Sequence, residues 1–334
     1  MSVALSHQVR APHWILNYAG ADISADISPM VISIAYFDYL SARAGELEVA
    51  LEDSDRRWQG AWYPGLGDRL NLSIGYASEP LLPCGDFEID QLELEGPADV
   101  FRLRCLSAYI TPAMRTRYCV AYENQSLLQI ATAVAAKYQL GVVAAPDAPD
   151  LRFERVTQSH ETDLAFLNRL ALAHGYDFTV RGTDLVFYSR AALEAQPPTL
   201  TLKRGDVVAF AFENRTRAVY KAAEVAYHDG LSRSLIAYTA AAENIPTGDT
   251  RKLIVRCENA QQAMLKARAA LTGANQWFLQ ARLTMPGTTA VSAGNILALD
   301  GWASFDGAYI VETARHSLSR RSGYVTQIHA RRVA

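Results

Sequence analysis

The stretch GELEVALED, residues 45–53, decides the fold class through its alternation. Apolar and acidic side chains take opposite faces of an extended strand, with Leu47, Val49 and Leu51 against Glu48 and Glu52. A period of two residues is what a half-buried antiparallel strand requires. DRLNLSIGY (68–76) and DVFRLRCLSA (99–108) alternate in the same way, and turn signals separate the runs at 64–68 and 95–99. Strands spaced like this predict a barrel or a sandwich.

A different pattern begins near residue 112, where helical periodicity replaces alternation. Residues 123–142, ENQSLLQIATAVAAKYQLGV, are typical of an amphipathic helix that Ser126 caps and Gly141 ends. Its apolar stripe consists of Leu127, Ile130, Ala131, Val134 and Tyr138. Further on, YDFTV and LVFYS are joined by RGTD, which predicts a β-hairpin with Gly182 in the turn. We therefore expect an inserted α+β domain at 113–195, closed by a linker at 194–199.

Residues 157–180, TQSHETDLAFLNRLALAHGYDFTV, gather four side chains that could bind metal or protons: His160, Glu161, Asp163 and His174. A zinc-protease helix needs its second histidine four positions after the first, and position 164 is Leu. A helix start explains the pattern better, with Ser159 as the cap and the acids near the positive end of the helix dipole. The expected buried stripe is Leu164, Leu167, Leu170 and Ala171. We expect His174 to act as a cation near the carbonyl end, which Gly175 terminates.

The last part of the chain, 196–334, returns to strand patterns around one helix at 259–273, which Asn259 caps and Gly273 stops. A weak internal repeat links this part to residues 1–112. The first part runs LEVALED, GDRLNL, GDFEIDQLEL and VFRLRCLSA, and the last part runs LQARLTM, GNILAL, GAYIVETARHSL and YVTQIHARR. A duplication predicts two related β-barrels, while chance similarity among strands is the competing explanation.

The composition excludes several classes of protein. The 334 residues are 50% hydrophobic and 20% charged, and the net charge is −3, so no overall positive field attracts nucleic acid or a membrane. Arginine outnumbers lysine by 27 to 5, which fits an interface-rich protein or a GC-rich genome. The cysteines form no CxxC pair, so we expect reduced, mostly buried thiols and no zinc: Cys84, Cys105, Cys119 and Cys257. Neither a signal peptide nor a membrane-spanning stretch is recognisable.

Motifs for catalysis are also missing from the sequence. It has no GxSxG elbow and no Gly-Lys-Ser/Thr phosphate loop, and GLGDRL lacks a glycine of the dinucleotide loop. The acidic pairs Asp53/Asp55 and Asp86/Asp90 could supply the acid and base of a glycosidase, but acids at strand ends are usually solvated. The C-terminus is basic, with Arg315, His316, Arg320, Arg321, His329, Arg331 and Arg332. Because only Tyr324 offers a stacking aromatic there, we interpret these residues as a solvent- or interface-facing row.

Four segments together resemble the phage late-control D tail proteins: 47–76 followed by 84–108, 114–140, 158–180 and 306–332. The pattern Gln-x-x-Glu-Ser/Thr-Asp-x-x-Phe-Leu-x-Arg-Leu-Ala is carried by Gln158, Glu161, Thr162, Asp163, Phe166, Leu167, Arg169, Leu170 and Ala171. The last segment matches at Asp306, Gly307, Tyr309, Val311, His316, Gly323, Tyr324 and Thr326. The resemblance runs in order through nearly the whole chain and is weakest over 200–255.

The resemblance implies a structural baseplate hub protein of a contractile phage tail or a related injection particle, similar in fold to the hub part of VgrG spike proteins. It implies a mainly β fold with an α+β insert. Two related β-barrels, at 1–112 and 196–334, would form a pseudo-sixfold ring in a homotrimer. Such a ring adapts the sixfold tail tube to the threefold spike and forms part of the central channel. No catalytic, cofactor-binding or metal-binding residues are implied.

The implied partners are further copies of the chain, a trimeric tail spike, the tail tube protein and baseplate wedge proteins, with the tape measure protein as a further candidate. DNA is only cargo in the channel, and no membrane is involved. The protein would be made in the cytoplasm of the bacterial host and reside in the tail baseplate. Residues lining the channel should be acidic or neutral, so that DNA passes without binding.

Two other functions stay open at this point. A tail-associated cell-wall hydrolase would need converging acids or a nucleophile–base pair in a cleft. A DNA-binding late-gene regulator, indicated only by the family name and the basic C-terminus, would bind DNA in a salt-dependent way.

Overall fold

A computed structural model describes residues 10–41, 43–108, 112–144, 151–215, 219–230, 233–242, 245 and 247–333. The first part of the chain forms an antiparallel array in the order β3-β4-β7-β6-β5-β1-β2. Its elements are β1 (Pro12–Tyr18), β2 (Ala21–Asp22), α1 (Ser24–Ile27), β3 (Val31–Tyr39), β4 (Glu46–Glu52), β5 (Arg69–Tyr76), β6 (Leu82–Glu95) and β7 (Val100–Ser107). The expectation that no signal peptide is present concerns the N-terminal stretch, and residues 1–9 of that stretch lie outside the described residues.

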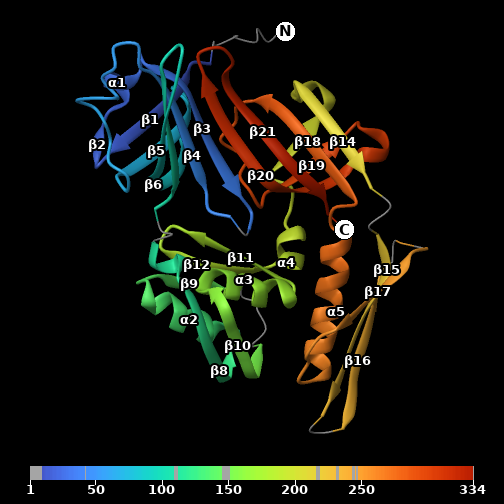
Figure 1. Ribbon diagram of the computed structural model, residues 1–334. Helices are drawn as coiled ribbons and strands as arrows, with labels where there is room; N and C mark the ends of the chain where they lie inside the picture. Colours follow the sequence, from blue (N-terminus) through green and yellow to red (C-terminus); the bar gives the residue numbers. More distant parts are fainter. Residues whose placement is uncertain are drawn as a thin grey trace.

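The last part forms a second array in the order β14-β18-β21-β20, with β19 on β20 and β13 on β19. Its strands are β13 (Leu200–Lys203), β14 (Ala209–Asn214), β18 (Leu279–Pro286), β19 (Ile296–Asp300), β20 (Gly307–Ser319) and β21 (Gly323–Arg332), with the 3-10 turns η2 (Arg204–Asp206) and η3 (Ala303–Phe305). β20 also pairs with β3, so the two arrays join into one 13-stranded sheet (Figure 1). We call this the main sheet.

The strand order of the main sheet reproduces the internal repeat. β3-β4-β7-β6-β5 and β14-β18-β21-β20-β19 follow the same path, and every pair within each path is antiparallel. β6 has a bulge between Ile89 and Gln91, and β20 has one between Val311 and Thr313. Matching the bulges aligns Gly85 with Gly307, and both glycines have positive φ, +101° and +137°. Chance similarity does not explain a shared order, a shared bulge and a shared left-handed glycine.

Each half of the main sheet packs its own hydrophobic core. The alternating residues expected to be buried in the first half are buried, including Leu47, Val49 and Leu51. The second core lies under β18–β21 and includes Leu283, Val311 and Ile328. Among the described strands neither half closes into a barrel, because the main sheet runs on from one half into the other through β3 and β20.

The inserted α+β part lies below the main sheet in Figure 1. It contains β8 (Arg117–Ser126), α2 (Leu127–Lys137), β9 (Gly141–Ala144), β10 (Arg152–Thr162), α3 (Asp163–Ala173), β11 (Tyr176–Arg181), β12 (Asp184–Ser189) and α4 (Arg190–Glu194), after the 3-10 turn η1 (Pro112–Arg115). The predicted hairpin is present as β11 and β12. Ser126 caps α2 in a full capping box with Gln129. The helix is shorter than predicted, because residues 123–126 end β8 and Gly141 begins β9.

Details of the α3 prediction were wrong. Ser159 is not the cap: a bulge at His160 prolongs β10 as far as Thr162, whose hydroxyl accepts from the Ala165 amide. Leu164 is only half-buried, and Phe166 completes the buried stripe with Leu167, Leu170 and Ala171.

The described residues of 220–275 do not join the second half of the main sheet, contrary to expectation. They form a separate three-stranded sheet of β15 (Tyr220–Asp229), β16 (Ser234–Ala241) and β17 (Asp249–Ile254), with α5 (Ala260–Asn275) packed on it. Asn259 caps α5 as predicted. Gly273 does not stop it, because the helix continues for two more residues to Asn275. None of the described helices is both long and apolar enough to cross a membrane.

Candidate functional site

The main sheet has one face turned away from both cores, and we call it the polar face. Direct cross-strand partners define it across both halves, for example Ala35 with Glu48 and Arg315 with Phe37. Apart from the buried Arg331, the charged side chains of its strands are Asp22, Glu46, Glu48, Glu52, Asp86, Glu88, Glu93, Glu95, Glu213, Asp300, Arg69, Arg102, Arg104, Lys203, Arg282 and Arg315. Acids outnumber bases on this face.

The arginines of the polar face are partly neutralised by neighbours. Arg102 contacts Glu95 at 3.2 Å, and Arg104 contacts Glu93 at 3.5 Å. Arg315 donates to the Gln327 side chain at 2.9 Å. The two ion pairs have exposed arginines and contribute little to stability, but they reduce the positive charge that would retain a polyanion.

The main sheet also has strand edges without a described partner, and two of them lie on opposite sides of it in Figure 1. One is the outer edge of β14. The other is the outer edge of β6 beyond Ile89, where pairing with the β5 side ends. Both edges expose large apolar side chains: Phe210 is 42% exposed and Leu94 is 49% exposed. Unpaired edges of this kind are templates for pairing with another chain.

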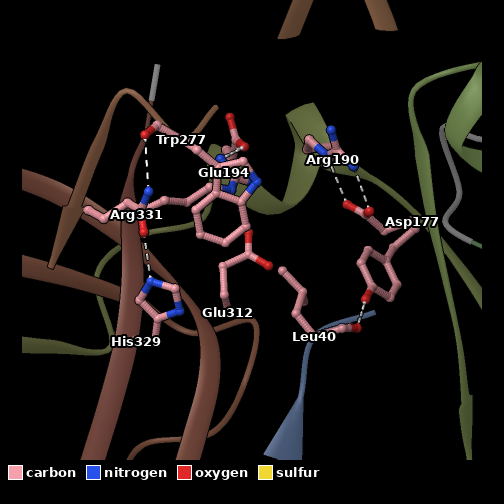
Figure 2. A network of polar contacts seen from close by, with 10 residues as sticks. Leu40, Asp177, Arg190, Glu194, Trp277, Glu312, His329 and Arg331 are labelled. Atoms are coloured by element: carbon pink, nitrogen blue, oxygen red, sulfur yellow. Dashed lines mark hydrogen bonds and ion pairs between the residues drawn. The ribbon is translucent and has the colours of Figure 1, made fainter. Parts of the chain in front are cut away.

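A buried ionic cluster joins the main sheet to the insert, and Figure 2 shows it at close range. Arg331 of β21 is 1% exposed; its Nε donates to the Glu312 carboxylate at 2.5 Å, and its Nη1 lies 2.6 Å from the Glu194 carboxylate. Burial raises the pKa of Glu312, and the Arg331 charge opposes that rise. Glu194 belongs to α4 and Glu312 to the β20 bulge, so Arg331 ties the two parts together.

A second set of contacts lies beside this cluster (Figure 2). Arg190 makes two hydrogen bonds to Asp177, at 2.7 and 3.0 Å. Burial alone would lower the pKa of Arg190, but the Asp177 carboxylate raises it. The Tyr188 hydroxyl donates to the Leu40 carbonyl at the end of β3. The Arg190–Asp177 pair lies within the insert, and the Tyr188 contact joins the insert to the end of β3.

The side chains singled out at 157–180 do not converge on one site. Glu161 pairs with Arg169 at 2.6 Å, which lowers the pKa of Glu161, and His160 is exposed on the bulge. Asp163 is buried and accepts from Lys137, Tyr138 and Gln158. These contacts give each acid a structural role within the insert.

His174 is not the helix-end cation that we expected. It is buried, its Nδ1–H donates to the Leu170 carbonyl at 2.8 Å, and burial lowers its pKa to about 4. His174 is therefore neutral near pH 7 and fills the core beside Phe153. In the described part of the chain, no group of three or more His, Cys, Asp or Glu could hold a metal ion.

The acidic pairs considered for catalysis are separated by their own contacts. Asp53 is buried and accepts from the Trp58 amide, while Asp55 pairs with Arg57. Asp86 accepts from Asn71, and Asp90 accepts from Arg115. Three of the cysteines are buried and Cys119 is exposed.

The basic C-terminal residues do not form one row. His316 is completely buried, with Tyr324 and the Val291 carbonyl as hydrogen-bond partners. Burial lowers its pKa to about 4. Arg331 is buried in the ionic cluster, whereas Arg320 is exposed and contacts Glu52. Sequence patterns missed the cluster because its members come from β20, β21 and α4.

Comparisons with curated proteins give two relatives, each named probable baseplate hub protein. The relative from Escherichia phage 186 is 27% identical over 214 residues, covering 63% of this chain and 54% of the relative. The relative from Escherichia phage P2 is 28% identical over 199 residues, covering 58% and 51%. The chain is similar to phage baseplate hub proteins. It spans about half the length of the curated relatives it matches, and no family model matches it.

Solved structures of tail proteins share the fold. The 43 kDa tail protein of prophage MuSo2 from Shewanella oneidensis has a TM-score of 0.76 at 16% identity, covering 96% of this chain and 98% of that one. The tail protein from Neisseria meningitidis MC58 has a TM-score of 0.73 at 13% identity, covering 96% of each chain. The E. coli c3393 protein, a type VI secretion component, has a TM-score of 0.57 at 14% identity, covering 90% and 73%. The mainly β fold and the resemblance to tail hub proteins are thus confirmed.

Proposed function

We propose that this protein is a structural hub of a contractile tail baseplate or a related injection particle. The observation that carries the proposal is the repeat in the main sheet: two halves with one strand order, one bulge and one left-handed glycine. A chain with two equivalent halves can match a sixfold partner on one side and a threefold partner on the other when three copies assemble.

In this proposal three copies close into a ring with near-sixfold form around a channel. The two repeated domains are 1–112 and 196–334, with the α+β domain 113–195 outside the ring and residues 220–275 as an excursion from the second domain. The polar face lines the channel, except where the insert covers it around Ile310 and Arg331, because it carries an excess of acids. An acidic lining lets DNA pass as cargo without binding.

The proposed partners are further copies of the chain, the trimeric tail spike, the tail tube protein and the baseplate wedges, with the tape measure protein as another candidate. The relatives' names support this assignment, as does the shared fold. The protein would be made in the host cytoplasm and carried in the tail. It would have no catalytic activity, which fits the structural contacts of Glu161, Asp163 and His174.

The test is the mass of the purified chain in solution, alone and mixed with a trimeric spike protein from the same particle. A hub gives three times the 36.7 kDa chain mass in at least one of the two samples. A chain that stays monomeric in both contradicts the proposal. A wall-degrading hydrolase would instead release soluble fragments from purified cell wall, which we do not expect.

A further inference from the structure

The junction between the two halves shows how sheet edges of this fold meet. β20 and β3 pair antiparallel, with His316 opposite Tyr36 and Ser317 opposite Ala35. His316 is 0% exposed and Tyr36 is 9% exposed, and their rings stack at 6.1 Å. This junction therefore buries the backbone edge of both strands together with two aromatic rings.

The repeat gives the equivalent positions in the other two strands. Aligning the bulges places Leu94 of β6 at the position of His316, and Glu95 at that of Ser317. Tracing the pairing from β7 and β21 through β4 and β18 places Phe212 of β14 at the position of Tyr36. Phe210 and Ala211 then correspond to Ile34 and Ala35. Within one chain, the outer edges of β6 and β14 have no described partner strand at these positions.

We infer that β6 of one copy pairs antiparallel with β14 of a second copy, in the register of the β20–β3 junction. Leu94 lies opposite Phe212, and Glu95 lies opposite Ala211. Because β6 and β14 lie on opposite sides of the main sheet (Figure 1), the contact is head-to-tail, so it must close into a ring or propagate. This inference rests on the proposed hub function, which requires closure after three copies.

Hydrogen-bonding directions agree with this register. The Arg215 amide donates to the Phe278 carbonyl. By alternation, the backbone N–H and C=O groups of Ala211 and Glu213 point towards β18, whereas those of Phe210 and Phe212 point to the open edge. The Ala108 amide donates to the Asp86 carbonyl. Following the pairing with β7 past the bulge, the backbone groups of Glu93 and Glu95 point towards β7, whereas those of Leu92 and Leu94 point to the open edge. The backbone N–H and C=O groups of Leu94 and Phe212 thus both face an open edge, as the proposed register requires.

Exposed apolar surface also fits a second copy. Leu94 is 49% exposed where its equivalent His316 is completely buried, and Phe210 is 42% exposed where its equivalent Ile34 is 0% exposed. Pairing covers both side chains and removes both open edges. One contact is unfavourable, because Glu93 lies opposite Glu213. Arg104 and Arg215 already pair with these acids and reduce the repulsion.

Cysteine cross-linking tests the register. Glu95 and Ala211 would form a non-hydrogen-bonded pair with Cα atoms about 4.5 Å apart, within the range of roughly 4.4–6.8 Å that a disulfide spans. In a Cys119→Ser background, Glu95→Cys with Ala211→Cys should form disulfide-linked species under mild oxidation, in a ladder that ends at three chains. The matched control, Glu93→Cys with Ala211→Cys, is displaced by two residues and should cross-link at least tenfold more slowly.

The outcomes separate the inference from the proposed function. Trimers by mass that do not cross-link through Glu95→Cys and Ala211→Cys overturn the pairing and leave the hub role standing. Faster cross-linking of the control overturns the register. Cross-linking by either single-cysteine variant alone indicates a twofold contact and overturns the head-to-tail arrangement. A ladder that continues beyond three chains overturns the closed ring of three. A chain that neither trimerises nor cross-links contradicts both proposals.

Discussion

Leu94 and His316 occupy equivalent positions of the repeat, yet Leu94 is 49% exposed and His316 is completely buried. The difference comes from the neighbouring strand. β3 covers the edge of β20 at His316, whereas no described strand covers β6 at Leu94. In a single chain Leu94 is therefore left exposed at a position where its equivalent is buried between two strands. Such exposure is what we expect of a residue that contacts a second copy.

The first prediction concerns this edge. Leu94→Glu places a charge where an apolar contact with Phe212 is proposed, so the dissociation constant of the assembly should rise tenfold or more, about 1.4 kcal/mol. Sedimentation equilibrium measures the change. Leu172→Glu, an equally polar change at a residue of the insert that is 40% exposed, should leave assembly unchanged. Equal assembly by both variants would argue against the edge contact.

The positive-φ glycine shared by the two repeated strands gives a second prediction. Gly85 has φ +101°, and a Cβ there meets no atom within 4 Å, so Gly85→Ala should destabilise the fold by backbone strain alone, about 1–2 kcal/mol. Gly273→Ala is the matched control. Gly273 lies inside α5 with open space around it, so alanine should stabilise by about 0.5–1 kcal/mol. Urea denaturation distinguishes the opposite signs, and a loss of stability at position 273 would show that the glycine is needed there.

The buried ionic cluster leads to a third prediction. Arg331→Met leaves Glu312 and Glu194 buried without their cation, which should cost about 3–5 kcal/mol. Arg155→Met removes an exposed pair with Glu123 and should cost at most about 1 kcal/mol. Thermal unfolding of the two variants provides the comparison. Similar melting temperatures would mean that Arg331 does not hold the insert to the main sheet.

The buried histidines predict a pH dependence. The pKa of His316 falls from 6.5 to about 4 because the ring is desolvated beside Tyr324 and the Val291 carbonyl. The unfolded chain then binds a proton that the folded chain does not, so stability is present above pH 6.5 and is lost as the pH falls towards 4. Between pH 6.5 and 5 the loss should be about 2 kcal/mol for this histidine. His174, with the same lowered pKa, should act alike in the insert. Denaturant unfolding at stepped pH measures the slope, and a flat profile above pH 5 contradicts it.

The excess of acids on the polar face predicts that the protein does not detectably bind DNA. Because its acids outnumber its arginines, the protein should cause no salt-dependent anisotropy change with duplex DNA at physiological ionic strength. Glu48→Arg combined with Glu93→Arg should introduce such binding, with an affinity that falls steeply as salt rises. Specific DNA binding by the unmodified chain would favour a regulator over a hub.

Local patterns in the sequence are sufficient for part of this fold. Alternation predicts β4, β5 and β7 with the correct buried faces, because each strand has one face on a core. Cap chemistry predicts the starts of α2 and α5 at Ser126 and Asn259. The order of four strand types also shows the repeat before any coordinates.

Contacts between distant segments explain what the sequence could not show. The bulge at His160 moves the α3 cap to Thr162, and only strand pairing reveals it. In sequence His316 and Arg331 look like members of a solvent- or interface-facing row and His174 like a helix-end cation, but tertiary packing buries all three. The polar face and the two open edges depend on which strands are neighbours, and this is set by register across the whole chain.

The most direct test of the central claim is a cryo-electron microscopy reconstruction of the assembled protein. Three copies should form a closed ring of near-sixfold form, with the polar face lining a channel and β6 of each copy paired to β14 of the next. An assembly whose polar face points outward, or whose β6 and β14 edges remain unpaired, would contradict the account.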